Sequence, residues 1–348
     1  MKPTLVEDLK GHEVLAVDVL SSDFTVLLSA ETELNDELIA KLKNHRIYEV
    51  YLKDVDSSAE LSIIKDEVRK EVHETLQSIL EKHTYAAGSE LEELSNAADK
   101  IISDILEEED VVNKLYDIRR RSADIYEHCI SVCSISTLIA LKRRLSEELV
   151  HDIGVACLIH ELGLKYITID YVNKEIYEMT ESDAMEYKKH PIYGYAGIEN
   201  AEWLSEAARM IVLTHHERDD GSGFPYGTIN LPEHCQIVQI CDVFDELICG
   251  IGCERVKVYE ALEYLKIYKG TKFSKTIVDD FMALIAVYPV GSYVRTSEGE
   301  LGVVLRQNKD FPDRPVVRII KDRDGKAVKN IIIKDLLKIT TLFIEDAD

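Results

Sequence analysis

The chain has 348 residues, a formal net charge of −24, 46% hydrophobic residues and 30% charged residues. Its length predicts two or three domains, and its composition is that of an ordinary globular protein rather than a disordered one. So acidic a chain repels polyanions, which excludes long DNA or RNA as a partner. A small phosphate ligand is still compatible with this charge, because bound metal ions supply local positive charge.

The sequence also limits the expected location of the protein. No apolar run reaches the roughly 20 residues that cross a bilayer, so we expect no membrane partner. The acidic start, MKPTLVEDLKGHEV, is unlike a secretory signal. The seven cysteines are scattered and odd in number, which argues against a disulfide framework and favours the reducing cytoplasm.

Four segments follow one another along the chain. Residues 1–55 predict a small α+β module, with strand-like runs (VLAVDVL, FTVLLS, YEVYL) around the helical pattern ELNDELIAKLKNH. Residues 56–120 predict a helical linker, whose apolar spacing in LSIIKDEVRKEVHETLQSIL is compatible with a coiled-coil seam and a homodimer. Helical patterns continue through residues 121–287, and residues 288–348 alternate in the strand manner between turns. The predicted fold is therefore mainly α: a helical bundle with a small N-terminal α+β module and a small C-terminal β module.

Residues of the kind that bind metals recur through the bundle at intervals of about one helical hairpin. They are His128, His160, Glu161, His190, His215, His216 and Asp242. Helices around a common axis are able to direct such side chains inward, which is how bundles build metal sites. Imidazole and carboxylate together suit Fe, Mn or Zn. Asp124 lies four residues before His128, on the same expected helix face, and is a further candidate ligand.

Two His-acid pairs compete for the central place in this series. His151-Asp152 precedes an apolar helical pattern, and His160-Glu161 ends it. His160 lies 32 residues after His128 and 30 residues before His190. This spacing favours His160-Glu161 as the metal-binding pair and makes His151-Asp152 a feature of the helix start.

Four stretches resemble the HD-GYP family, a branch of the HD-domain phosphohydrolases that linearise cyclic di-GMP. They are HELGLKYITIDYVNK, EYKKHPIYGYAGI, HHERDDGSGFPYG and QICDVFDEL, and the resemblance covers about residues 121–285. The terminal segments LKGHEVLAVDVL and YPVGSYVRTSEGELGVVL also resemble modules that accompany such domains.

The resemblance implies roles for individual residues. Asp242 and five histidines fall where the family has metal ligands: His128, His160, His190, His215 and His216. Glu161 falls where the family has a bridging Asp, and Asp124 falls where some members have a Glu that holds a third metal. It implies two or three divalent ions, Fe or Mn, and a small cyclic dinucleotide as substrate. The implied reaction is hydrolysis of a phosphodiester by a metal-bridged hydroxide, with Glu161 and Asp242 as the catalytic residues.

The loop DDGSGFPYG after the histidine pair is the candidate substrate-binding segment. Its glycines permit a sharp turn and a close approach to a ligand, and Pro225 stiffens the end of the loop. The expected substrate-binding residues are Arg218, Asp220, Gly223, Phe224 and Pro225. For Arg218 and Asp220, fixing the loop to the domain and contacting a phosphate are both open.

The sequence departs from the family pattern at several places. Glu161 replaces Asp, Leu164 replaces a Lys, Phe224 replaces a Tyr, and ICGIGCERVK replaces a T-S-x-R-P-Y-R stretch, with Arg255 as a partial substitute. Each lost charge-assisted hydrogen bond costs about 1.5–3 kcal/mol. Three hypotheses therefore stand: a cyclic di-GMP phosphodiesterase that yields the linear dinucleotide or GMP, a non-catalytic receptor or scaffold, and a phosphohydrolase for another cyclic dinucleotide.

Overall fold

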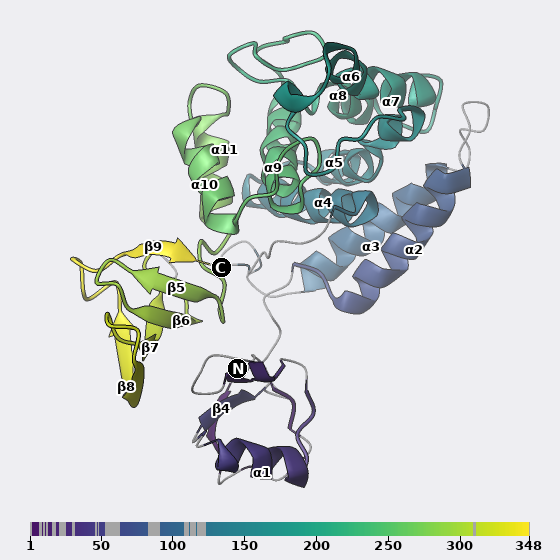
Figure 1. Ribbon diagram of the computed structural model, residues 1–348. Helices are drawn as coiled ribbons and strands as arrows, with labels where there is room; N and C mark the ends of the chain where they lie inside the picture. The colour runs from purple at the N-terminus through teal and green to yellow at the C-terminus, as the bar shows by residue number, and fades with distance from the viewer. Residues whose placement is uncertain are drawn as a thin grey trace. The chain divides into compact units, whose positions relative to one another are not determined.

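The computed structural model describes residues 123–308 without a gap (Figure 1). It also describes the rest of the chain except residues 1, 7–8, 10, 12, 16–18, 21–25, 30–31, 46, 48, 53–62, 83–90, 108–110, 112–115, 117–122, 309–310 and 348. The predicted boundaries at 55–56 and 120–121 lie outside the described residues, as do parts of the predicted strands VLAVDVL and FTVLLS.

The chain divides into two compact units. One comprises residues 62–289, 307–315 and 347–348, and the other comprises residues 1–61, 290–306 and 316–346. The first unit is helical. Its helices are α2 (Asp66–Lys82), α3 (Glu93–Glu107), α4 (Ile125–Lys142), α5 (Glu147–Ile159), α6 (Glu181–Tyr187), α7 (His190–Ile198), α8 (Glu206–Thr214), α9 (Glu233–Cys249), α10 (Val258–Ile267) and α11 (Lys275–Met282), with short 3-10 helices η4 (Leu162–Tyr166) and η5 (Ile176–Glu178).

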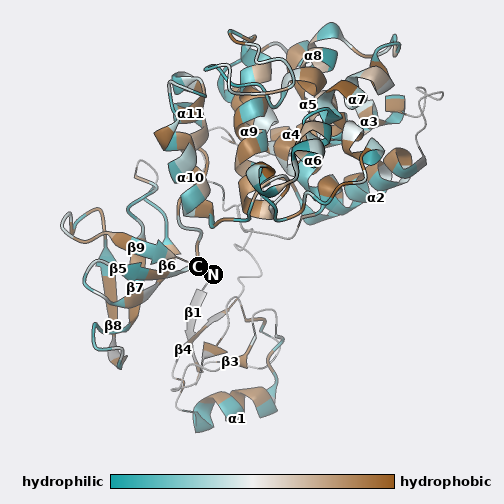
Figure 2. Cartoon of the chain, turned by 45° about the horizontal axis from the view of Figure 1, so that its top comes forward, coloured by the Kyte–Doolittle hydropathy of each residue, from teal (hydrophilic) through white to brown (hydrophobic). Residues whose placement is uncertain are grey.

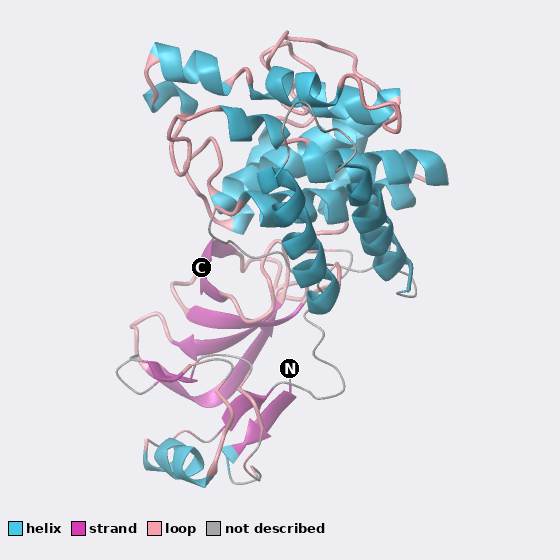
Figure 3. Ribbon diagram, turned by 90° about the vertical axis from the view of Figure 1, so that its right-hand side faces the viewer, coloured by secondary structure: helices cyan, strands magenta, loops and turns pink. Residues whose placement is uncertain are grey.

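The second unit holds the β-strands and helix α1. Its N-terminal part has strands β1 (Lys2–Leu5), β2 (Val19–Leu20), β3 (Val26–Leu28) and β4 (Glu49–Leu52) with α1 (Asp36–Asn44), and β1 pairs with β4. Its C-terminal part is a five-stranded sheet of β5 (Tyr293–Thr296), β6 (Leu301–Arg306), β7 (Val316–Lys321), β8 (Ala327–Asp335) and β9 (Ile344–Ala347), in the order β8-β7-β6-β5-β9. The long helices belong to the first unit and the strands to the second, and helices, cyan in Figure 3, comprise more residues than strands, which confirms the predicted mainly-α fold class.

The core of the helical unit is built around α4, α5 and α9, along which Figure 2 shows many hydrophobic residues. Helix α4 is buried from His128 to Ala140. Its 18 residues are long and apolar enough to cross a membrane by composition, but 72% of that stretch is buried inside the protein. Its apolar surface therefore belongs to the core, where side chains pack as densely as in a crystal.

Helices α2 and α3 pack on this same core. Val72 and Leu76 of α2 and Ala98 and Ile101 of α3 are at most 1% exposed and belong to the same cluster as the α4 and α5 side chains. The apolar face that made the linker segment compatible with a dimer seam is thus buried within one chain.

Candidate metal centre

Seven side chains from six helical elements meet in the helical unit. They are His128 in the first turn of α4, His160 at the end of α5, Glu161 at the start of η4, His190 at the start of α7, His215 and His216 at the end of α8, and Asp242 in the middle of α9. Each is at most 3% exposed. The structure therefore brings together every predicted ligand of the series that begins at His128.

The seven side chains form two groups that share Glu161. One group is Glu161 with His190, His215 and His216, and the other is Glu161 with His128, His160 and Asp242; in each, the ligand atoms lie within 4.8 Å of one another. Glu161 Oε2 lies 3.1 Å from His190 Nε2, while Oε1 lies 3.9 Å from His128 Nε2. The carboxylate thus presents one oxygen to each group.

Three of the imidazole rings are oriented by hydrogen bonds from Nδ1, the ring nitrogen that points away from the centre. The Nδ1 atom of His160 lies 2.7 Å from the carbonyl oxygen of Cys157, and the Nδ1 atoms of His190 and His215 each lie 2.8 Å from a carbonyl oxygen three residues earlier. A carbonyl only accepts hydrogen bonds, so each Nδ1 carries a hydrogen, and in the neutral ring Nε2 keeps its lone pair. This is the arrangement in which histidine binds a metal through Nε2.

The inward atoms of the cluster fit divalent cations. His128 Nε2 lies 3.1 Å from His160 Nε2, and His190 Nε2 lies 3.2 Å from His215 Nε2. In the neutral, metal-binding form of these rings both Nε2 atoms of each pair carry lone pairs, which do not hydrogen-bond to each other but are both able to bind a cation. In the described structure, both carboxylate oxygens of Glu161 and Oδ2 of Asp242 are buried with no hydrogen-bond partner. Buried carboxylates are stable only when paired or bound to a metal, and this mixture of imidazole and carboxylate suits Fe, Mn or Zn.

Burial and the neighbouring charges set the protonation of the cluster. Burial alone would raise the pKa of Glu161, but the neighbouring His190 lowers it to about 2. Burial lowers the pKa of His215 to about 3, with the neighbouring His160 acting in the same direction. Burial of His128 would lower its pKa, but hydrogen bonds to Asp242 and Asp245 raise it well above the ordinary value. Without a cation, protons thus compensate the buried carboxylates, and a metal ion competes with them for these sites.

Asp124 lies outside both groups. It is the N-cap of α4, where its Oδ1 accepts hydrogen bonds from the backbone N–H groups of Tyr126 (2.9 Å) and Glu127 (3.1 Å). Its Oδ2 lies 3.3 Å from His73 Nε2. The expectation that it shares a helix face with His128 does not hold, because α4 begins one residue later and Asp124 has extended backbone geometry.

The alternative pair His151-Asp152 also lies apart from the centre. Both residues are in α5 (Glu147–Ile159), and His151 Nε2 is 2.9 Å from Ser95 Oγ on α3. The spacing of the histidines predicted this separation, but the expected place at a helix start is wrong, because α5 begins at Glu147 and its N-cap is Ser146.

The candidate substrate loop is held at its start by Arg218 and braced internally by Asp220. Arg218 Nη1 donates to the carbonyl oxygens of Glu217 (2.8 Å) and His215 (3.1 Å), and its guanidinium lies 5.3 Å from the ring centre of Phe273. Asp220 Oδ1 accepts from the N–H and hydroxyl of Ser222 (2.9 and 2.6 Å). Of the two roles left open, these contacts are those of residues that fix the loop.

Gly223 and Phe224 bring this loop against the histidine pair. A Cβ on Gly223 would overlap Glu217 Cα and lie 2.5 Å from the carbonyl oxygen of His216, so a side chain has no room there. The Phe224 N–H donates to the same His216 oxygen (3.1 Å), and the Phe224 ring centre lies 4.4 Å from that of His216. Pro225, half-buried, is joined to Phe224 through a cis peptide bond.

Sequence reasoning missed three buried acids near the centre. Asp245 Oδ2 lies 2.8 Å from His128 Nδ1, and Glu246 Oε1 lies 3.8 Å from His216 Nε2. Both come one helical turn after Asp242 in QICDVFDEL, and this i, i+3, i+4 spacing was the available signal. The third, Glu217, accepts the backbone N–H groups of Tyr226 (2.8 Å) and Thr228 (2.9 Å) and so closes the loop.

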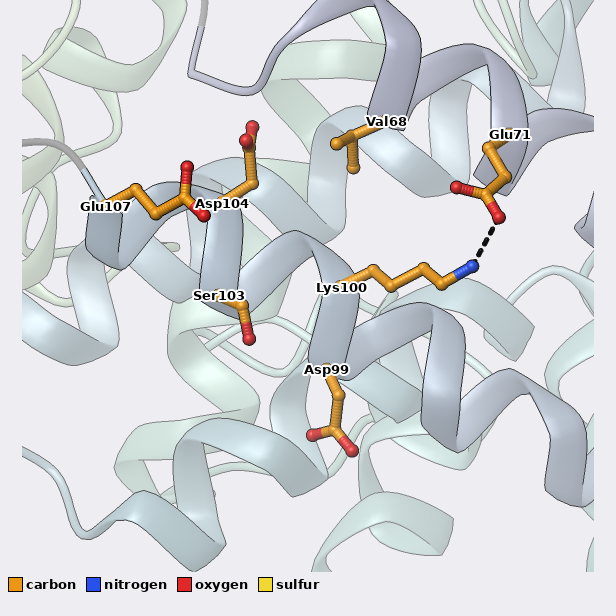
Figure 4. A pocket seen from close by; sticks show the side chains of 7 residues that line it. All are labelled: Val68, Glu71, Asp99, Lys100, Ser103, Asp104 and Glu107. Atoms are coloured by element: carbon orange, nitrogen blue, oxygen red, sulfur yellow. Dashed lines mark hydrogen bonds and ion pairs between the residues drawn. The ribbon is translucent and has the colours of Figure 1, made fainter.

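Two further features lie away from the centre. Lys165 donates to the carbonyl oxygens of Leu80 (2.6 Å) and Glu81 (3.1 Å) at the end of α2, so its charge is committed there. A hollow of about 330 Å³ between α2 and α3 is drawn in Figure 4. Four of its seven lining residues are acidic, and its Lys100 is already paired with Glu71. It is not a site that would attract a phosphate.

Two family models match the chain. A model described as an HD domain matches residues 100–277, half of the chain, and one described as a KOW domain associated with HD domain matches residues 293–348.

Relatives and a solved structure extend this similarity. The chain is 26% identical over 217 residues to a cyclic di-GMP phosphodiesterase of Pseudomonas aeruginosa, covering 62% of this chain and 52% of that one. It is 34% identical over 151 residues to the cyclic di-GMP phosphodiesterase response regulator RpfG of Xanthomonas campestris, covering 42% and 39%. It thus spans about half or less of these relatives' length. A solved HD-GYP-type protein from Bdellovibrio bacteriovorus, 17% identical, shares the fold with a TM-score of 0.50 over 80% of this chain and 97% of that one.

Proposed function

Because the chain belongs to the HD domain family, in its HD-GYP branch, we propose that it is a metal-dependent phosphodiesterase that hydrolyses cyclic di-GMP. The observation that carries the proposal is the pair of ligand groups that share Glu161, whose imidazole and carboxylate atoms are turned inward in a buried space. The relatives named for cyclic di-GMP support the choice of substrate.

Bound divalent ions would supply positive charge that activates a water molecule and offsets the charge of a phosphodiester during in-line displacement. The chain's own residues hold the geometry for this chemistry. Glu161 spans the two positions, and Asp242 faces His128 and His160 through Oδ1, at 3.1 and 3.2 Å. The backbone carbonyls and Asp245 fix the ring orientations, so little reorganisation accompanies the reaction.

Substrate approach is best supported on the side of His216 and Phe224. Glu161 and His216, each 3% exposed, are the two members of the centre that reach the surface at all, and the Phe224 ring lies against His216. Arg218 and Lys165 are committed to backbone carbonyls. Recognition of the two phosphates therefore depends chiefly on the metal ions, and we expect tight binding of a cyclic dinucleotide only in the metal-loaded protein.

The test is metal analysis paired with a hydrolysis assay. The protein is purified without oxygen, its metals are counted, and cyclic di-GMP is supplied with Fe²⁺ or Mn²⁺. We expect the wild-type protein to bind at least two ions per chain and to turn over cyclic di-GMP. The double variant His215→Ala/His216→Ala should lose metal and turnover. His151→Ala, outside the centre, is the matched control and keeps both. Wild-type protein that binds no metal would rule out the proposal.

A second candidate function rests on the departures from the family pattern. Leu164 is buried where the family has a Lys, and Lys165 is committed to the end of α2. A relative from Vibrio cholerae, 27% identical over 236 residues, is named as a 3'3'-cGAMP-specific phosphodiesterase, and the chain covers 44% of it. A metal-loaded protein that cleaves 3'3'-cGAMP but not cyclic di-GMP would establish that specificity, and binding of either without turnover would establish a receptor.

A further inference from the structure

We propose that Glu246 is a metal ligand and that, with His216 and Asp242, it forms a further cation position beside the two groups that share Glu161. The inference rests on the proposed function, since it extends the same centre. It assigns to α9 a second ligand, one helical turn after Asp242.

The three side chains surround a common space. His216 Nε2 lies 3.8 Å from Glu246 Oε1, and His216 Nδ1 lies 3.5 Å from Asp242 Oδ2. One ligand atom from each of the three lies within 4.8 Å of the other two. Separations of this size leave room for an ion at ordinary metal–ligand distances of about 2.0–2.2 Å.

Asp242 provides the independent observation. Its Oδ1 faces His128 Nε2 and His160 Nε2, at 3.1 and 3.2 Å. Its Oδ2 faces His216 instead, and in the described structure this oxygen is buried with no hydrogen-bond partner. A fully buried carboxylate oxygen in that situation is stabilised by a cation on its own side. The two groups that share Glu161 need only Oδ1 of Asp242.

Among the described residues, the Glu246 side chain has no strong hydrogen-bond donor that would account for its burial. Its side chain is 9% exposed, and the Tyr187 hydroxyl donates to Oε1 across 3.5 Å, at the outer limit of a hydrogen bond. By contrast, the buried Glu217 accepts two backbone N–H groups at 2.8 and 2.9 Å. A buried carboxylate with so weak a donor, beside His216 and the open oxygen of Asp242, is placed as a ligand.

The position suggested by the family resemblance, Asp124, does not serve this purpose. Its carboxylate caps α4 and contacts His73. We therefore assign the additional carboxylate ligand to Glu246 in α9 rather than to Asp124 at the start of α4.

Mn²⁺ binding to the metal-depleted full chain tests the proposal, with stoichiometry and affinity measured by calorimetry and by competition with a chelator. Wild type is compared with Glu246→Gln, Tyr187→Phe and Asp124→Asn. Tyr187→Phe removes the hydroxyl but keeps the ring, and Asp124→Asn keeps a good N-cap. Circular dichroism of the metal-free proteins checks folding. If Glu246→Gln does not fold, Glu246→Asp, which shortens the carboxylate, takes its place with the same expectation.

We expect Glu246→Gln to bind one Mn²⁺ fewer per chain, or to bind its weakest ion at least about tenfold less tightly, which is the smallest effect of removing even an outer partner of a ligand. Tyr187→Phe and Asp124→Asn should bind as wild type does. The inference is overturned by wild-type binding in Glu246→Gln, by an equal loss in Tyr187→Phe, or by loss in Asp124→Asn. Wild-type protein that binds no Mn²⁺ would instead contradict the proposed function.

Discussion

Asp245 Oδ2 lies 2.8 Å from Nδ1 of His128, and both side chains are fully buried. The carboxylate fixes the ring of His128 and directs its Nε2 to the centre, the task that backbone carbonyls perform for His160, His190 and His215.

Replacing Asp245 with Asn should therefore weaken metal binding. A neutral amide does not stabilise the partial positive charge of a metal-bound His128 ring as a carboxylate does. The loss of such an outer partner costs about 10–100-fold in metal affinity. Competition between the protein and a chelator for Mn²⁺ measures the change. An affinity equal to that of wild type would show that the contact does not orient His128.

Gly163 lies against the start of α7. A Cβ built there overlaps the carbonyl oxygen of His190 and lies 2.8 Å from the backbone nitrogen of Gly194, so Gly163→Ala must displace α7 and His190 with it. We expect lost metal binding and a lower free energy of unfolding. Gly154→Ala is the comparison, because its Cβ meets only side chains, at 3.3 Å or more. That variant should change stability by no more than about 1 kcal/mol. Equal effects of the two substitutions would contradict the close-approach argument.

Glu217 closes the substrate loop through the N–H groups of Tyr226 and Thr228. Glu217→Gln removes the charge and turns an amide donor toward one of these donors, at a cost of about 1.5–3 kcal/mol for each charged hydrogen bond lost. We expect a raised KM for the cyclic dinucleotide with unchanged metal content. Asp220→Asn, in the same loop, keeps the turn with Ser222 and should leave KM near the wild-type value. A change in metal content without a change in KM would count against the assigned role.

His234, in the first turn of α9, provides a pH-dependent test. Burial lowers its pKa below the ordinary 6.5, opposed by Asp152 and Glu233. The unfolded chain therefore takes up a proton more readily than the folded one, so the free energy of unfolding falls as the pH drops below about 6.5. His234→Gln should lose less stability than wild type between pH 8 and pH 5, as denaturant unfolding at each pH measures. Parallel pH profiles for the two proteins would refute this.

Some residues of the centre could be predicted from the sequence and others could not. The histidines, Glu161 and Asp242 were predicted because their order resembles a known pattern and their spacing matches helical hairpins. Asp124 was placed wrongly on the face of α4, because periodicity does not locate the residue at which a helix begins, and here the capping geometry does. Asp245 and Glu246 were passed over because acidic residues on helices are usually solvated, whereas here α9 packs against other helices, α4 and α8 among them, and both side chains are buried.

The linker illustrates the same limit at the level of the fold. Its amphipathic pattern predicted helices, and α2 and α3 exist. An apolar face, however, does not name its partner. Val72 and Leu76 are fully buried in the chain's own core, which the spacing alone could not distinguish from a second copy.

The contacts of His160, His190 and His215 with carbonyl oxygens three residues earlier have a consequence for how the centre is encoded. Each ring is oriented by a carbonyl of its own helical turn, so four consecutive residues determine the direction of its metal-binding nitrogen. Contacts between distant parts of the chain then have to bring these turns together. Short segments of the sequence therefore set the orientation of the ligand rings, and the fold of the whole helical unit sets where those rings meet.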